Sequence, residues 1–146
     1  MKEEKVILPL VIIAVIVLVG LTSGVLTVKN PFISTSSVNA QLGGKWNIQN
    51  YYTGNNSITE ILSDSQGDVL VVTQYSFSSA SQAQSFFYSN QLSSPEQYGN
   101  YMISYYAHGL SESVYILSGS KVYYVSYVAT TSLSLPSISQ LVNLIK

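Results

Sequence analysis

An uninterrupted apolar run near the N-terminus constrains this chain more than any other feature. Residues 6–28, VILPLVIIAVIVLVGLTSGVLTV, are 23 residues without a charged side chain. A helix needs roughly 20 apolar residues to cross the hydrocarbon core of a bilayer, and only a helix satisfies all backbone hydrogen bonds within one segment. We therefore predict a transmembrane helix at 6–28. Pro9 falls in its first turns, where few hydrogen-bond donors are lost.

The lysines on either side of the run indicate its orientation. Lys2 and Lys5 lie with the amino terminus in the tail of residues 1–5, whereas Lys29 alone follows the run. Cytoplasmic flanks carry the excess of Lys and Arg, so we expect a cytoplasmic tail and a C-terminal part outside the cytoplasm. The chain is thus predicted to be a single-pass signal-anchor protein of the cell membrane, with the lipid bilayer as its first partner.

A cleaved secretory signal is the alternative interpretation of the same run. The apolar stretch of a signal peptide is usually about 7 to 15 residues long, which is shorter than this one. Small residues that a signal peptidase accepts do occur near Gly24 and near Ala40. Length favours a retained anchor.

The chain beyond the anchor has the size of one domain. Residues 29–44 are rich in Ser and Asn and end in a glycine pair, and we interpret them as a linker. Residues 45–146 are predicted to form one extracytoplasmic α+β domain. One amphipathic helix is expected at 78–92, and a second follows Pro136.

Six short runs in this domain have the composition and spacing of strands. They are residues 45–52, 57–63, 68–77, 101–108, 113–118 and 121–130. We expect a mainly antiparallel sheet of about six strands with two helices packed on it. The similar order of elements in 61–81 and 116–134 suggests a duplicated three-strand-plus-helix unit, although any antiparallel α+β domain shows such periodicity.

Groups for catalysis or metal binding are scarce. The chain has one histidine, His108, no Cys and no Gly-x-Ser-x-Gly motif. The DSQGD turn at 64–68 lacks the alternating ligands of a calcium loop and is typical of a hairpin turn with Asp64 as an acceptor. We predict no enzyme activity, no metal and no cofactor; a small-ligand carrier or enzyme around His108 is the alternative. Six lysines without arginine form no basic track, which excludes nucleic acid as a partner.

Tyrosine is the residue type that points most directly to a binding surface. The sequence has 12 Tyr, which pack well in strands and also give recognition surfaces a large contact area. Adjacent tyrosines on a strand point to opposite faces, so some must lie outside the main core. The predicted binding face comprises Tyr105, Tyr106, Tyr123, Tyr124 and Tyr127. Asn55 begins an Asn-Asn-Ser glycosylation triplet, which agrees with an extracytoplasmic domain.

Charge is sparse in this chain. Charged residues make up 9%, against roughly 25% in soluble domains. Ser, Thr, Asn and Tyr supply the polar groups, and arginine is absent. In this composition the soluble part resembles cell-surface proteins of acidophilic archaea, which implies a small membrane-anchored surface protein. Few ion pairs can be lost on acidification, so we expect stability to change little from neutral pH to about pH 3.

These features favour a non-catalytic binding or structural role, such as an accessory subunit of a membrane complex or a component of the cell envelope. The expected partner is another membrane or envelope protein. A pilin-like assembly subunit is an alternative, because type IV pilins and their archaeal relatives also combine a charged leader, an apolar helix and a β-rich head. Their processing site places a small residue after a basic one, whereas Val6 follows Lys5 here.

Overall fold

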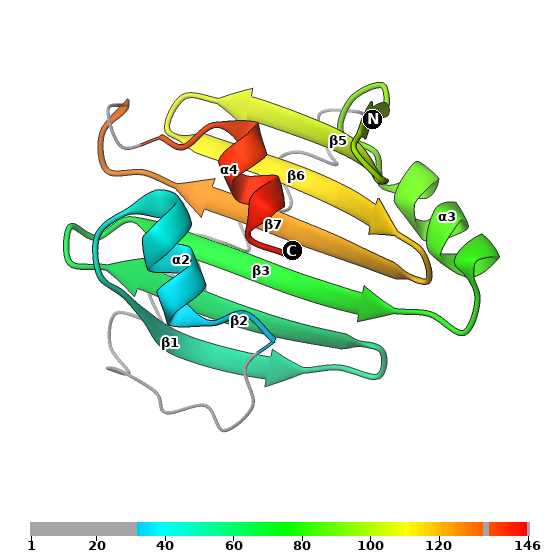
Figure 1. Ribbon diagram of the computed structural model, residues 1–146, viewed down its shortest axis with the longest axis horizontal. Coiled ribbons are helices and arrows are strands. Elements are labelled where there is room, and N and C mark those ends of the chain that lie inside the picture. The colour runs from blue at the N-terminus through cyan, green and yellow to red at the C-terminus, as the bar shows by residue number, and fades with distance from the viewer. Residues whose placement is uncertain (1–31, 133–134, 146) are drawn as a thin grey trace.

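The computed structural model describes residues 32–132 and 135–145, which form a seven-stranded antiparallel sheet with three helices (Figure 1). The predicted anchor at 6–28 lies outside the described residues. Within the described part, no helix is long and apolar enough to cross a membrane. The α+β fold class and the antiparallel sheet are confirmed.

The strands follow one another along the chain as two meanders. They are β1 (Trp46–Thr53), β2 (Ser57–Asp64), β3 (Val69–Ser76), β4 (Glu96–Tyr98), β5 (Tyr101–His108), β6 (Ser111–Ser118) and β7 (Lys121–Val128). The spatial order is β1-β2-β3-β7-β6-β5-β4, and each neighbouring pair is antiparallel. The last strands of the two meanders, β3 and β7, therefore pair at the centre of the sheet.

Two helices cover one face of the sheet, which we call the front face and which carries Leu62, Leu70 and Val125. They are α2 (Thr35–Leu42) and α4 (Ile138–Asn143), seen in front of the strands in Figure 1. Each begins at a serine whose side chain accepts a backbone N–H of the first turn. A serine cap satisfies a donor that the helix itself leaves free.

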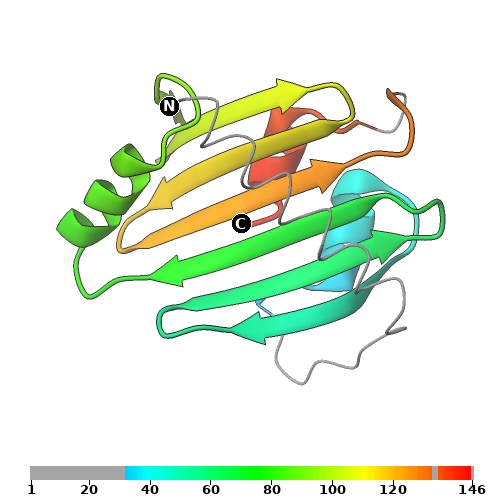
Figure 2. The ribbon, with the colours of Figure 1, turned by 180° about the vertical axis from the view of Figure 1, so that it is seen from behind.

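The third helix, α3 (Ala80–Ser89), lies on the opposite, back face at one end of the sheet. Its buried residues Ala83 and Phe87 cluster with Leu117 of β6 and Val122 of β7. Figure 2 shows the strands in front of α2 and α4, with α3 beside the end of β6 and β7. The three helices thus cover different parts of the sheet rather than one shared face.

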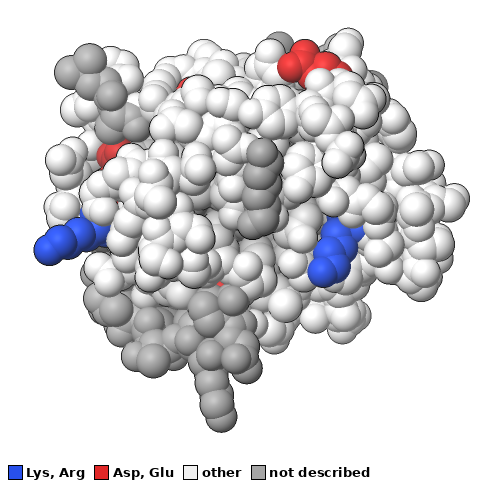
Figure 3. All heavy atoms as spheres, in the orientation of Figure 1, with Lys and Arg blue, Asp and Glu red and all other residues white. Residues whose placement is uncertain are grey.

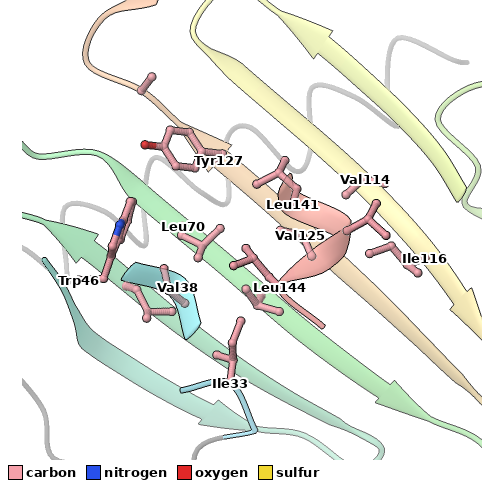
Figure 4. Packing of buried hydrophobic residues seen from close by; sticks show 14 of the residues in the cluster. Ile33, Val38, Trp46, Leu70, Val114, Ile116, Val125, Tyr127, Leu141 and Leu144 are labelled. Atoms are coloured by element: carbon pink, nitrogen blue, oxygen red, sulfur yellow. The ribbon is translucent and has the colours of Figure 1, made fainter. Parts of the chain in front are cut away.

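The main hydrophobic core lies between the front face and the helices α2 and α4. Its buried members are Ile33, Val38, Trp46, Ile48, Leu62, Leu70, Val72, Ile103, Val114, Ile116, Val125, Tyr127, Ala129, Leu141, Val142 and Leu144. In Figure 4 side chains from the strands, from α2 and from the C-terminal segment meet in this layer. Burial of apolar area on this scale is the main force that holds such a domain together.

The strand β3 carries apolar side chains on both of its faces because it lies at the centre of the sheet. Leu70 and Val72 of β3 face the front core, whereas Val69 and Val71 belong to a smaller cluster with Ile61. The main core thus lies on the side of Leu70 and Val72, and the side of Val69 and Val71 is apolar as well. A strand in the middle of a sheet is apolar on both faces.

Two elements add to the expected set. The range 29–44, interpreted as a linker, contains α2, in which Val38 is fully buried. The short edge strand β4 pairs with β5 and makes the strands seven rather than about six. At the other edge, the β1–β2 register shifts between Ile48 and Asn50, which marks a β-bulge.

Candidate functional site

The five tyrosines of the predicted binding face fall on both sides of the sheet. Tyr105, Tyr123 and Tyr127 pack with the front-face core. Tyr106 and Tyr124 follow a front-face residue directly along β5 and β7, so they point to the back. The structure therefore does not bring the five side chains together on one surface.

On the back face, an aromatic cluster lies under α3. Phe86 packs against Tyr75 with ring centroids 4.6 Å apart, and Tyr115 packs against Tyr124 at 4.7 Å. Burial raises the pKa of Tyr75, Tyr115 and Tyr124, so these phenols stay protonated at physiological pH. The Tyr124 hydroxyl donates to Ser113 Oγ at 3.2 Å. Tyr75 and Tyr115 thus contact Phe86 of α3, and Tyr124 supports Tyr115 from the sheet.

His108 is exposed at the end of β5, where its ring stacks on Tyr106 with centroids 6.2 Å apart. The register pairs His108 with Ser111, and the next residue, Glu112, consequently points to the opposite face. Among the described residues, no group of three or more acidic or histidine side chains could hold a metal ion. The histidine and the neighbouring carboxylate are therefore not arranged as an acid–base pair.

Asn55 is exposed in the turn between β1 and β2. The Gly54 N–H donates to the Ser57 carbonyl at 2.8 Å and closes this turn. A glycan on Asn55 would extend into solvent, so the site is accessible. Glycosylation of Asn55 stays a prediction.

A polar pocket of about 300 Å³ opens where the β2–β3 turn meets the segments after α2 and before α4. Its lining residues are Leu42, Gly43, Gly44, Asp64, Gln66, Asp68, Tyr127, Leu135, Pro136 and Gln140. Four segments far apart in sequence thus build one concave site. None of the residues predicted from sequence lies in this lining except Tyr127.

Asp68 forms the inner wall of the pocket and is 1% exposed. Its Oδ2 accepts the Tyr127 hydroxyl at 2.6 Å, and its Oδ1 accepts the Thr130 N–H and hydroxyl at 2.8 and 2.9 Å. Burial and the bond to Asp68 raise the pKa of Tyr127 well above its usual range. Tyr127 is therefore a permanent donor to this carboxylate, and the pair joins the β2–β3 turn to β7.

Asp64 organises the turn at the mouth of the pocket. Its Oδ1 accepts the N–H groups of Gln66 and Asp68, both at 2.9 Å. Gly67 has φ +90°, a conformation that residues with a side chain rarely adopt. This confirms the predicted hairpin turn, with Asp64 as the acceptor and Gly67 at positive φ.

Two glycines after α2 form the facing wall. The Gly43 carbonyl accepts Trp46 Nε1–H at 2.9 Å. At Gly44, which has φ +77°, an added Cβ would lie 3.9 Å from Asp64 Oδ2. Bare backbone therefore lies opposite the carboxylate.

The polar lining of the pocket consists of two carboxylates and two amides. Asp68 and Gln140 already bond within the protein, which leaves Asp64 and Gln66 as the polar side chains at the mouth, and the described lining residues include neither His nor Lys. Such a lining suits a group that donates hydrogen bonds, for example an ammonium or a hydroxyl.

Sequence reasoning missed this pocket because its key contact joins residues 59 positions apart. The only available signal was an acidic residue directly before the apolar run VLVV, where a carboxylate is expected to be drawn toward the core. The chain matches no protein-family model, no curated protein and no solved structure.

Proposed function

We propose that this chain is a single-pass membrane-anchored protein whose extracytoplasmic head has a non-catalytic binding role. The observation that carries the binding role is the acceptor-rich pocket at the β2–β3 turn, lined by Asp64, Gln66 and Asp68. The pocket would take an ammonium or hydroxyl group of a partner, which we expect to be another membrane or envelope protein.

The apolar run at 6–28 supports the anchor. It is long enough to span a bilayer, and it ends shortly before Phe32, where the described head begins. The lysines of the tail favour a cytoplasmic N-terminus. The head would then stand at the outer surface of the cell membrane.

The surface of the head supports recognition through short-range contacts. Figure 3 shows one face of the head, on which charged side chains are few and scattered. Such a surface gives little long-range electrostatic steering. Affinity would then depend on hydrogen bonds and aromatic contact area.

We also infer that the head arose by duplication of a three-strand-plus-helix unit. The central register supports this, because Val69 pairs with Val128 while Ser76 pairs with Lys121. This is the pairing expected when two equivalent strands are related by a two-fold axis. Each meander is followed by one helix, but α3 lies on the back face and α4 on the front face, so the two-fold relation covers the strands and not the helices.

Topology can be tested by protease treatment of intact cells that express the chain with a tag at either end. A retained anchor predicts that a C-terminal tag is removed while an N-terminal tag is protected and stays in the membrane fraction after alkaline extraction. A protected C-terminal tag, or its appearance in the medium, would contradict the proposed topology.

Binding at the pocket can be tested by pull-down of the full-length protein from gently solubilised native membranes. Gln66→Trp places a bulky ring at the exposed rim of the pocket, and Gln84→Trp makes the same change on the exposed side of α3. We expect a partner that is recovered with wild type and Gln84→Trp but lost with Gln66→Trp. Equal recovery with both variants would exclude the pocket as the binding site.

A further inference from the structure

Glu60 is a carboxylate buried completely inside the domain. It lies on β2 between the register partners Tyr51 of β1 and Val72 of β3, and its exposure is 0%. Its Oε1 accepts the Phe32 N–H at 3.1 Å, and its Oε2 accepts the Ile33 N–H at 3.3 Å. Both oxygens thus hold two consecutive peptide groups directly before α2.

Besides Glu60, the segment of residues 32–42 is held by packing in the front-face core and by hydrogen bonds that Asn39 and Gln41 accept from Trp46 and Gln140. Ile33 and Val38 are its members in the front-face core, and Figure 4 shows both near Leu144. Most of the remaining side chains of α2 are polar and exposed or half-buried. An eight-residue helix is not stable by itself, so its position depends on these contacts and on Glu60.

Among residues 32–132 and 135–145, no lysine forms an ion pair with Glu60. The ionisable neighbours on its face are Tyr51 on β1 and Asp64 further along β2, while α2 and α4 contain no ionisable side chain. Burial raises the pKa of Glu60 to about 7, against the smaller opposing effect of the Ile33 and Phe32 N–H groups. The cost of desolvating the charge therefore exceeds the gain from the two hydrogen bonds.

We propose that Glu60 is a pH-sensitive latch, which holds residues 32–42 on the sheet while it is protonated and releases this segment when it loses its proton. Opening exposes the carboxyl group to water, where it ionises at its ordinary pKa. Closing therefore takes up a proton, and rising pH favours the open state. The latch itself does not rest on the proposed function.

Its consequence does rest on the proposed anchor. The latched segment begins at residue 32, shortly after the apolar run of residues 6–28. Its release would therefore lengthen the connection between the bilayer and the sheet. In an acidic exterior the head would be held close to the membrane, and at neutral pH it would be free to reorient.

Hydrogen exchange of the full-length protein in detergent micelles tests the latch without any variant. After correction for the intrinsic pH dependence of exchange, the opening equilibrium of the 32–42 amides should rise by on the order of tenfold or more from pH 5 to pH 8, levelling off above pH 7. The β7 amides at 121–128 should not share this rise. No rise, or the same rise in both segments, would overturn the proposal.

A pair of variants isolates the carboxyl group. Glu60→Gln cannot ionise, and Glu96→Gln makes the same change at an exposed position on β4. We expect exchange of residues 32–42 to become independent of pH in Glu60→Gln and to keep the wild-type slope in Glu96→Gln. A wild-type slope in a folded Glu60→Gln would overturn the proposal, and the comparison of segments in wild type decides the matter if that variant does not fold.

Discussion

The first meander, β1 to β3, and the second, β5 to β7, share a layout but differ in the polar groups they bury. The first fully buries the carboxylates Glu60 and Asp68 and also buries Thr73, whereas the second buries the hydroxyls Ser104 and Ser126 and only half-buries its carboxylate Glu112. A buried hydroxyl has the same charge at every ordinary pH, and a buried carboxyl does not. Two similar backbones can therefore respond differently to pH.

The helices are also distributed unequally over the two meanders. Although α3 follows β3 in sequence, it packs on β6 and β7 of the second meander. The helix α4 contacts β6 from the front face, and α2 contacts β1. The second meander is thus covered by helices on both faces, and the stability of the domain should depend most on that part.

The largest expected effect comes from removing the α3 anchor. Phe87→Ala should lower the free energy of unfolding by about 4 kcal/mol, because a fully buried ring is lost and a cavity remains. Urea unfolding of the full-length protein in detergent measures this. Tyr88→Ala, at a neighbouring ring that is 47% exposed, is the control and should have a small effect. A loss in Phe87→Ala as small as that in Tyr88→Ala would mean that α3 does not stabilise the second meander.

Asp68 connects the two meanders, so its removal tests whether they are separable. Asp68→Ala should cost about 3 kcal/mol, because Tyr127 and Thr130 lose a charged acceptor inside the protein. Lys121→Ala, at the first residue of β7 in the second meander, changes an exposed side chain and serves as the control. The measurement is again urea unfolding, and a cost below that of Lys121→Ala would contradict the link.

Stability should fall as pH rises from about 4.5 to about 7, the range between the ordinary and the raised pKa of Glu60. In this range the folded state keeps a proton that the unfolded state releases, and the change should be about 2 kcal/mol. Burial shifts the pKa of Glu112 in the same direction. Melting temperatures across this range give the slope, and Glu60→Gln should flatten it. An unchanged slope would assign it to other groups.

The smallest effect compares one tyrosine on each face. Tyr127→Phe should cost about 1.5 kcal/mol, since the hydroxyl is bonded to a buried carboxylate, and Tyr124→Phe about 0.5 kcal/mol, since it donates to a neutral hydroxyl. Chemical unfolding of both variants measures the difference. The reverse order would show that Asp68 is not the stronger acceptor.

The sequence was sufficient to predict the strands and the helix α3, because their apolar residues recur with the periods of two and 3.6 that each element imposes. The helix α2 was missed because its sequence, TSSVNAQL, has no apolar stripe and buries only Val38. The strand β4 was missed because it is only three residues long. Elements that are short or lack a periodic apolar pattern cannot be predicted from the local sequence.

The pocket and the buried carboxylates could not be predicted, for a different reason. Glu60 meets Ile33 across 27 residues, and Asp68 meets Tyr127 across 59. A single sequence shows which side chains are acidic but not which distant donors will surround them. The prediction that acid changes stability little rests on the number of charges, whereas the pKa of Glu60 depends on where that carboxyl group lies.

The two edges of the sheet bear on how such heads behave when crowded together. One edge strand, β1, is interrupted by its bulge, and the other, β4, has only three residues. A neighbouring chain would find no long, regular row of free N–H and C=O groups to extend. Heads at high density would therefore resist fusing into a continuous intermolecular sheet, even though their sparse charge provides little mutual repulsion.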